Sequence, residues 1–276
     1  MSGTLFVVAT PIGNLEDLSP RARQTLARAD LIAAEDTRHT GRLLSHLGVK
    51  TPQFALHDHN EERAAPKLIK ELESGKTVAL VSDAGTPLVS DPGYRLVKAA
   101  HEHGIAVSPI PGPSAMTAAL SASGIPTDRF CFEGFLPSKR GAREKRLREL
   151  AQESRTIVFF ESVHRIGECL ADMVGAFGQE RAAFLGRELS KLHEQCLHAR
   201  LGDIAEQLES GAIAAKGEFV VVIGGAETPP ASTLDVDVLL AELAGVLPAR
   251  RAAAIAARVS GEKRNALYQR LLDLKA

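Results

Sequence analysis

The sequence predicts a protein with two α/β domains followed by a small helical module. Short apolar runs alternate with amphipathic stretches from Leu5 to Leu120, which is typical of a parallel or mixed sheet covered by helices. A second series of such elements follows a stretch rich in Ser, Gly and Pro at 121–127, which we expect to form a hinge, whereas the C-terminal residues show helical periodicity alone. We therefore expect α/β domains over 1–120 and 121–225, a linker over 226–233 and a helical module over 234–276.

The composition is that of an ordinary globular protein. A hydrophobic content of 45% over 276 residues supports a sizeable core, and the formal net charge of -1 excludes a globally basic nucleic-acid binder. No apolar run approaches the roughly 18 residues that a membrane span needs. The N-terminus lacks the basic region of a signal peptide, so we expect a cytoplasmic protein with no membrane partner. The widely spaced cysteines and the His-x-His pairs lack further ligands, so we expect no metal site.

In the first domain, strands and helices follow one another along the chain. We expect strands over 5–9, 31–34, 53–56, 77–81 and 105–110, and helices over 20–29, 43–47, 61–74, from 92 and from 114 onward. Ser19-Pro20 and Asp91-Pro92 each predict a helix start, because an oxygen-bearing cap precedes a proline at the first helical position. The polar cluster from Glu35 to Arg38 stands at a strand end. It either caps the next helix or forms one wall of a cleft.

The stretch from Leu80 to Gly93 predicts the floor of a small-molecule site. An apolar strand ends there in a short loop, and ligands of parallel sheets bind at the carboxyl ends of the strands. Gly85 can adopt a positive φ and lets a ligand approach the backbone, while Asp83 and Thr86 add polar groups. We therefore expect this loop to contact a ligand.

Two common nucleotide-binding motifs are missing around this loop. Gly75-Lys76-Thr77 resembles the end of a phosphate-binding loop, but that motif needs a glycine where the chain has Lys70. No G-x-G-x-x-G follows a strand either, so the usual dinucleotide fingerprint is absent. The turn from Pro111 to Ala115 is a second ligand-contacting turn or a plain helix start with Pro113 in the first position.

The second domain and the tail carry local basic segments. We expect strands over 130–135, 156–161, 183–185, 194–199 and 218–223, and helices over 143–152, over 163–177 and after 203. Basic residues gather at 138–148, where we expect an exposed loop, and from Pro248 onward, where seven basic residues oppose two acidic ones. The tail fits a small helix-turn-helix-like bundle. Its charge favours a phosphate backbone as partner, although solvated helix faces also carry basic residues.

Several of these segments together resemble a known family. They are Thr10–Leu15, Glu35–Arg38, Ser82–Pro87, Asp91–Gly93, Pro111–Ala115, Phe159–Arg165 and Gly186–Lys191. In combination they are similar to the bacterial ribosomal RNA small subunit methyltransferase I group of the tetrapyrrole (corrin/porphyrin) methylase superfamily. The resemblance covers nearly the whole chain. It implies two α/β domains with a cofactor cleft between them, and a homodimer.

The resemblance also implies an activity and its residues. The implied reaction is transfer of a methyl group from S-adenosylmethionine to the ribose 2'-oxygen of a cytidine in the decoding region of small-subunit (16S) rRNA. The implied cofactor residues are Pro11, Asp83, Ala84, Gly85, Thr86, Ser114, Ala115, Phe160 and Phe219. Candidates for proton handling are Glu35, Asp36, Asp91, Glu161, Glu188 and Lys191. Candidates for contact with ribosomal RNA or the small subunit are Arg38, Lys139, Arg140, Arg143, Arg165, Arg187, Arg250, Arg251, Lys263 and Arg264.

The chemistry of such a transfer requires alignment first and a base second. Alignment supplies an effective molarity on the order of 10^5 M or more, and a positioned base adds roughly 10^2 to 10^4-fold. Glu161 and Glu188 have a plainer alternative as ion-pair partners of Arg165 and Arg187. Two other functions stay open from the sequence: a methyltransferase acting on a tetrapyrrole, and a non-catalytic RNA-binding or ribosome-assembly protein.

Overall fold

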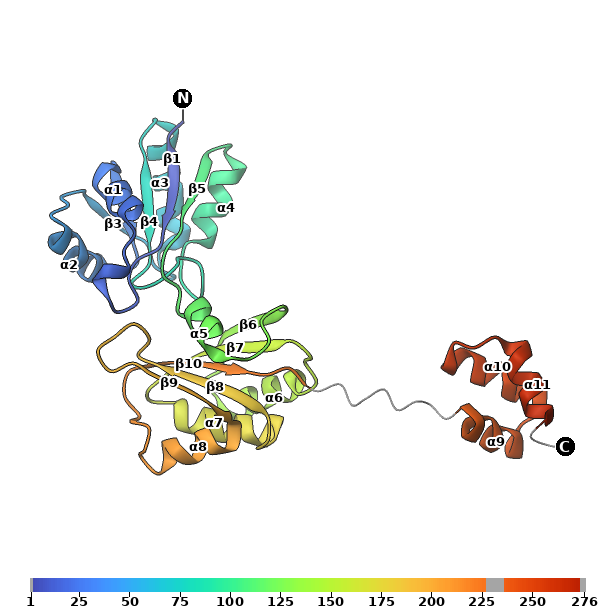
Figure 1. The fold of residues 1–276 in the computed structure, drawn as a ribbon. Helices are drawn as coiled ribbons and strands as arrows, with labels where there is room; N and C mark the ends of the chain where they lie inside the picture. Colours follow the sequence, from blue (N-terminus) through green and yellow to red (C-terminus); the bar gives the residue numbers. More distant parts are fainter. Residues whose placement is uncertain (1, 227–235, 274–276) are drawn as a thin grey trace. The chain divides into compact units, whose positions relative to one another are not determined.

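A parallel five-stranded sheet forms the centre of the first lobe (Figure 1). The computed structural model describes residues 2–226 and 236–273, and the chain divides into two compact units, 1–226 and 227–276. The strands of the first sheet are β1 (Thr4–Val8), β2 (Leu31–Ala34), β3 (Gln53–Ala55), β4 (Val78–Val81) and β5 (Ala106–Ile110), in the order β3-β2-β4-β1-β5. All pairs are parallel, so the carboxyl ends of the strands lie along one edge of the sheet.

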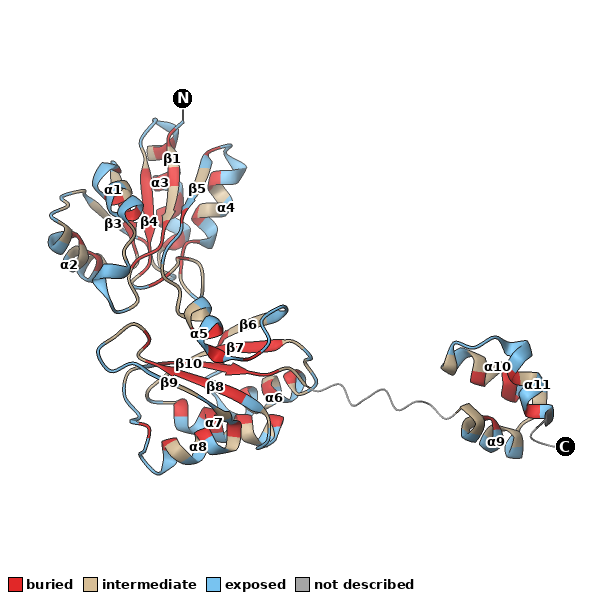
Figure 2. Cartoon of the chain, in the orientation of Figure 1, coloured by how far each residue is buried: buried red, intermediate tan, exposed pale blue. Residues whose placement is uncertain are grey.

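Helices cover both faces of this sheet, as the alternating pattern predicted. α1 (Pro20–Arg28) and α2 (Thr37–Leu47) pack on one face, and α3 (Glu61–Glu73) and α4 (Tyr94–Glu102) pack on the other. A short 3-10 turn, η1 (Leu15–Asp17), follows β1. Figure 2 shows that the central strands are buried, and every residue of β4 is buried. These two helical layers hold the carboxyl edge of the sheet in place.

Two helix starts in the first lobe differ from the prediction. α2 begins at Thr37 because the Asp36 side chain accepts a hydrogen bond from the backbone N–H of Arg38 at 2.8 Å, which confirms the capping interpretation of this cluster. Asp91-Pro92 does not open α4. That helix begins after Gly93, whose φ is +124°, and its first N–H groups donate to Glu61 Oε1 of α3 at 2.7 and 3.2 Å. Asp91 is therefore not a helix cap.

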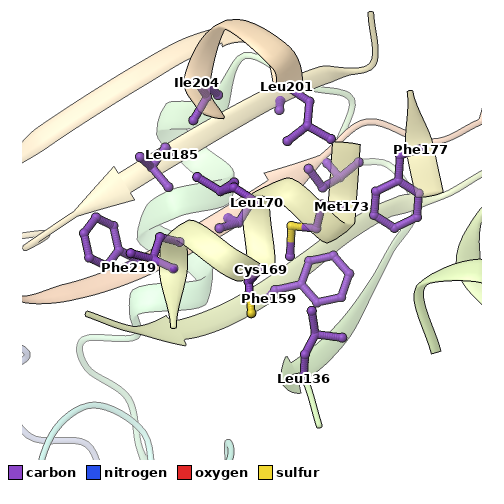
Figure 3. Close-up of a cluster of buried hydrophobic side chains, with 14 of the residues drawn as sticks. Leu136, Phe159, Cys169, Leu170, Met173, Phe177, Leu185, Leu201, Ile204 and Phe219 are labelled. Atoms are coloured by element: carbon purple, nitrogen blue, oxygen red, sulfur yellow. The ribbon is translucent and has the colours of Figure 1, made fainter. Parts of the chain in front are cut away.

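The second lobe is built on a mixed sheet. Its strands are β6 (Phe130–Phe135), β7 (Thr156–Ser162), β8 (Ala182–Arg187), β9 (Gln195–Arg200) and β10 (Glu218–Ile223), in the order β6-β7-β10-β8-β9. Only β6 and β7 pair in parallel among the described strands of this sheet. α6 (Arg140–Leu150), α7 (Ile166–Phe177) and α8 (Leu201–Glu209) cover one face, where Phe159, Leu170 and Phe177 form part of the core (Figure 3).

The helix α5 (Ala115–Ser123) packs on the other face of the second sheet. Its Ala119 and Leu120 lie in one buried cluster with Val158 of β7 and Val222 of β10. The expected hinge over 121–127 is therefore wrong in its first part, because residues 121–123 continue α5 up to Gly124. The division into 1–120 and 121–225 stays a prediction.

The C-terminal unit has three helices over its described residues, 236–273, and a core of its own. It contains α9 (Val236–Val246), α10 (Ala249–Ser260) and α11 (Arg264–Asp273). Leu240, Ala256 and Leu267 belong to its buried cluster, one from each helix. The expected linker over 226–233 lies outside the described residues apart from Ala226. Among the helices described, none is both long and apolar enough to cross a membrane.

Candidate functional site

A cavity of about 370 Å³ lies between the two lobes of the α/β unit. The first lobe contributes side chains from the loops that follow its parallel strands, and the second lobe contributes side chains from β6, β7 and β10. Of the cofactor residues implied by the resemblance, the ones that line this cavity are Asp83, Ala84, Gly85, Thr86, Ser114, Ala115, Phe160 and Phe219. Pro11 lines a smaller neighbouring cavity instead.

The glycine-bearing loop is fixed against the end of β1. Thr10 and Gly85 exchange two backbone hydrogen bonds of 2.8 and 2.9 Å, and the φ of Gly85 is +81°. The Thr86 hydroxyl donates to the carbonyl oxygen of Pro113 at 3.1 Å, which ties this loop to the turn before α5. A Cβ atom at Gly85 would lie 3.4 Å from Ile12 Cγ2. Glycine therefore keeps both the left-handed backbone and the width of the cavity.

Carboxylates from three loops form one wall of the cavity. The backbone N–H of Asp83 donates to Glu35 Oε2 at 3.3 Å, and the N–H of Asp36 donates to Asp83 Oδ1 at 3.1 Å. Burial raises the pKa of Glu35. Burial also raises the pKa of Asp91 from 3.8 to about 6, with a further contribution from the nearby Glu35 and Asp83, while a hydrogen bond with Ser82 opposes the shift. Asp91 is thus a half-buried, weakly acidic carboxyl inside the cavity.

The second lobe supplies an aromatic surface. The ring of Phe160 meets Phe132 and Phe135 edge-on, with centroids 4.9 and 5.8 Å apart. Such T-shaped pairs fix the orientation of the central ring. Phe135 and Phe160 both line the cavity. The floor of loops and carboxylates in the first lobe therefore faces a rigid aromatic surface.

Glu161 lies in this second wall with its oxygen atoms occupied. It is 2% exposed, accepts hydrogen bonds from the Ser162 N–H and the Cys169 thiol at 2.8 Å each, and pairs with Arg165 at 3.2 Å. Burial and the hydrogen bond to this carboxylate raise the pKa of the Cys169 thiol to about 12. The ion-pair interpretation of Glu161 and Arg165 is confirmed. Arg165 also donates to the carbonyl oxygen of Leu136 at 2.6 Å.

Glu188 and Lys191 do not line the cavity. Glu188 pairs with Lys191 at 2.8 Å and accepts the backbone N–H of Glu218 at 2.9 Å, so the alternative in which it pairs with Arg187 is wrong in its partner. The Lys191 side chain lies against Gly13 of the first lobe, where a Cβ atom would clash with it. These two residues belong to a contact between the lobes beside the cavity.

Two of the arginines expected to bind phosphate are buried inside the protein. Arg143 is 1% exposed and is held by Asp172 at 2.7 Å and Glu168 at 3.2 Å. Arg187 is 7% exposed and donates to the carbonyl oxygens of Lys216 and His193 at 2.7 and 3.1 Å. Neither guanidinium can reach a polyanion, so their expected RNA-binding role is wrong. The segment over 138–148 is also mostly helix α6 rather than a loop.

The other basic candidates for RNA contact differ in whether their side chains already form ion pairs. Arg38 is exposed and pairs with Asp36 at 2.7 Å, and Arg140 is exposed and pairs with Glu144 at 2.9 Å. Lys139 precedes α6 and is exposed. In the C-terminal module the exposed candidates are Arg250, Arg251, Lys263 and Arg264.

Sequence reasoning missed a group of basic residues on α2. His39, Arg42 and His46 line a smaller cavity of about 190 Å³ that shares Asp83 with the main one. Their spacing of three and four residues places them on one side of a helix, and this was the signal available in the sequence. It was not seen because the sequence predicted helix only from Leu43 onward.

The charge of the main cavity restricts its ligand. Its described lining includes Glu35, Asp83, Asp91, Glu161 and Glu218, and no lysine, arginine or histidine. Such a wall stabilises a cation and disfavours a nucleotide that carries phosphates. Within residues 2–226 and 236–273 no group of three or more His, Cys, Asp or Glu is arranged to hold a metal ion.

Each of the two units of the chain matches a known protein family. The family described as Tetrapyrrole (Corrin/Porphyrin) Methylases matches residues 4–205, and the one described as RsmI C-terminal HTH domain matches residues 230–275. Ribosomal RNA small subunit methyltransferase I of Xylella fastidiosa is 51% identical, covering 96% of this chain and 98% of that protein. The protein of the same name from Pseudomonas aeruginosa is 50% identical, covering 99% and 98%.

Solved structures share the fold at low identity. The methyltransferase CobJ superposes with a TM-score of 0.60 at 22% identity, covering 82% of this chain and 95% of that chain. A uroporphyrin-III C-methyltransferase from Thermus thermophilus, complexed with S-adenyl homocysteine, has a TM-score of 0.56 at 21% identity, covering 80% and 97%. The predicted fold class, two α/β sheets and a helical module, is confirmed.

Proposed function

We infer the activity of this chain from its family, because it belongs to the tetrapyrrole (corrin/porphyrin) methylases and, within them, to the ribosomal RNA small subunit methyltransferase I group. We propose that it uses S-adenosylmethionine to methylate the ribose 2'-oxygen of a cytidine in the decoding region of 16S rRNA. The observation that carries the proposal is the acidic cavity at the carboxyl ends of the parallel strands, in a chain about half identical to relatives with that name.

The cavity fits S-adenosylmethionine by charge and by shape. This cofactor carries a sulfonium and an ammonium cation but no phosphate, which matches a wall with carboxylates and no basic side chain among the described residues. The volume of about 370 Å³ lies within the usual range of small-molecule sites, roughly 300 to 1,000 Å³. Gly85 leaves its backbone accessible where a Cβ would narrow the cavity. When bound, the cofactor supplies an electrophilic methyl group.

The residues that hold the cofactor come from both lobes. In the first lobe we propose the loop Asp83–Thr86 together with Ser114 and Ala115. In the second lobe, Phe160 and Phe219 complete the wall. The Thr86–Pro113 hydrogen bond keeps the two first-lobe segments at a fixed separation before any ligand arrives. Alignment of the acceptor oxygen therefore depends on a preformed surface, and alignment is the larger part of the rate enhancement.

Asp91 is the group we propose to accept the proton of the 2'-hydroxyl. It lines the cavity, and a pKa of about 6 makes it a stronger base than an ordinary carboxylate while leaving it ionised at neutral pH. Glu35 lies beside it with a pKa that burial also raises, and it is the second candidate. We do not assign this role to Glu161, because its oxygens already accept hydrogen bonds from Ser162 and Cys169 and pair with Arg165.

The methyl acceptor would reach this site with help from exposed cations. We propose that Lys139, Arg140 and the C-terminal residues Arg250, Arg251, Lys263 and Arg264 contact phosphates of the ribosomal RNA.

We further propose, from the family alone, that the chain works as a homodimer in the cytoplasm. Light scattering on the purified protein measures the oligomeric state directly.

Cofactor binding and RNA modification test the proposal separately. Calorimetry should detect S-adenosylmethionine binding to the wild type and none to Gly85→Val, whose side chain narrows the cavity. Gly104→Val is the matched control: Gly104 is exposed, has a φ of +64°, and a Cβ atom there would have nothing within 4 Å. It carries the same backbone strain without touching the site, so it should bind normally. Equal affinity of Gly85→Val and the wild type would contradict the cofactor site.

Mass spectrometry of rRNA from a deletion strain tests the substrate. The cytidine ribose methyl should be lost on deletion and restored by the wild-type chain, but not by Asp91→Asn. A methyl group that persists without the gene would exclude the proposed reaction. Binding of S-adenosylmethionine without any change in rRNA would instead favour a tetrapyrrole or another small acceptor.

A further inference from the structure

A second cavity adjoins the acidic one on the surface of the first lobe. It has a volume of about 190 Å³ and is formed by the loop after β1 and by helix α2. Asp83 lines both cavities, so the two adjoin at this residue. We name the second one the α2 cavity. The carboxyl ends of β1 and β4 contribute to both.

The α2 cavity carries the charge that the main cavity lacks. His39, Arg42 and His46 line it, and all three are exposed. The Arg42 side chain makes no ion pair or hydrogen bond with any described residue, whereas the side chain of the neighbouring Arg38 pairs with Asp36 at 2.7 Å. An exposed, unengaged guanidinium next to two imidazoles is suited to bidentate contact with a phosphate.

The acidic wall of the main cavity would repel the phosphates of an RNA substrate. An RNA strand that brings its ribose to Asp91 must pass its own phosphates close to Glu35 and Asp83, and like charges at that range repel. Cations placed on the far side of Asp83 offset this repulsion. The cofactor has no phosphate. The phosphates that come close to the two cavities therefore belong to the acceptor RNA strand.

We propose that the α2 cavity binds the phosphodiester backbone next to the ribose that is methylated, with Arg42 as its main contact and His39 and His46 beside it. This inference rests on the proposed function, because it requires RNA as the acceptor. It assigns to the first lobe a substrate site that is separate from the cofactor cavity and from the basic C-terminal module.

The test is the substitution Arg42→Glu, assayed on small ribosomal subunits from a strain that lacks the methyl group. We expect KM for the subunits to rise on the order of tenfold, with kcat and the affinity for S-adenosylmethionine within about twofold of wild type. The slope of log affinity against log salt should fall by about one. Arg42 is exposed and unpaired, so the variant should fold.

Arg28→Glu is the matched control. Arg28 is the exposed last residue of α1, at the end of that helix away from the cavities, and it has no ion pair within the described residues. The charge change is identical, so a general electrostatic effect would raise KM in both variants equally and would overturn the inference. A rise confined to Arg42→Glu supports it.

A second measurement separates backbone contact from contact with a base. An RNA fragment whose phosphates beside the acceptor are uncharged methylphosphonates should bind wild type and Arg42→Glu equally. A difference that persists with this fragment would overturn the phosphate assignment. If the wild type methylates subunits and Arg42→Glu is unaffected, the inference fails while the proposed function stands. If the wild type binds S-adenosylmethionine but methylates no RNA, both fail.

Discussion

Replacing Asp91 by asparagine should stabilise the protein at neutral pH while removing its activity. Burial raises the pKa of this carboxyl from 3.8 to about 6 in the folded state. A carboxyl whose pKa is higher in the folded than in the unfolded chain binds its proton more tightly in the native state. The free energy of unfolding therefore falls as the pH rises from about 4 through about 6. Above that range the ionised Asp91 destabilises the folded protein.

The size of the effect follows from the shift. About two pKa units at 1.36 kcal/mol each correspond to about 3 kcal/mol between the fully protonated and the fully ionised limits. Asparagine keeps a side-chain oxygen for Ser82 but never ionises. Relative to wild type, Asp91→Asn should gain about 2 kcal/mol of unfolding free energy between about pH 4.5 and about pH 8.

Urea unfolding followed by far-UV circular dichroism measures this difference, since the chain has no tryptophan to report by fluorescence. The exposed Asp128, changed to asparagine, provides the control for loss of a carboxylate without burial. In parallel, kcat should fall roughly 10^2-fold or more in Asp91→Asn, and wild-type activity should decline as the pH falls through about 6. A stability difference that is the same at both pH values would refute the reasoning.

Three further predictions concern other parts of the chain. Arg143→Met should lower the unfolding free energy by about 3 kcal/mol, because the buried Asp172 loses its guanidinium partner at 2.7 Å and keeps only the longer pair with the exposed Arg140 at 3.5 Å. Arg140→Met should lose less than about 1 kcal/mol in the same urea assay, because the closer pair of Asp172 with Arg143 stays in place. Glu61→Ala should lose about 1 to 2 kcal/mol by removing the acceptor for the first N–H groups of α4, with the exposed Glu62→Ala near zero in thermal melts. A chain ending at residue 226 should bind RNA more weakly and with a flatter salt dependence, and equal salt slopes with and without the C-terminal module would contradict a role for it in RNA binding. Its affinity for the cofactor in calorimetry should not change, because residues of the α/β unit alone line the cavity.

The sequence was informative where local patterns determine structure. The apolar run before Asp83 and the glycine at 85 were sufficient to predict a ligand loop at a strand end, and Gly85 has the positive φ that was expected. The helical periodicity of the tail likewise predicted a module that proves to have its own core.

The errors came from contacts between residues far apart in the chain. Asp91-Pro92 has the local form of a helix start, but Glu61 from another helix caps α4 and leaves Asp91 in the cavity. Arg143 and Arg187 look like surface cations because a charge carries no local sign of burial, and their partners Asp172 and Lys216 are about 29 residues away. No periodicity indicates such pairings.

The strand order of the first sheet has a consequence for synthesis of the chain. β1 lies between β4 and β5, so its partners are made some 70 to 100 residues after it. Translation delivers the chain N-terminal end first at about 5 to 20 residues per second. For several seconds the apolar β1, with Leu5 and Val8 destined for the core, therefore has neither edge paired. The first lobe can close only after Ile110 has left the ribosome, and a nascent chain stalled before that point is expected to engage chaperones.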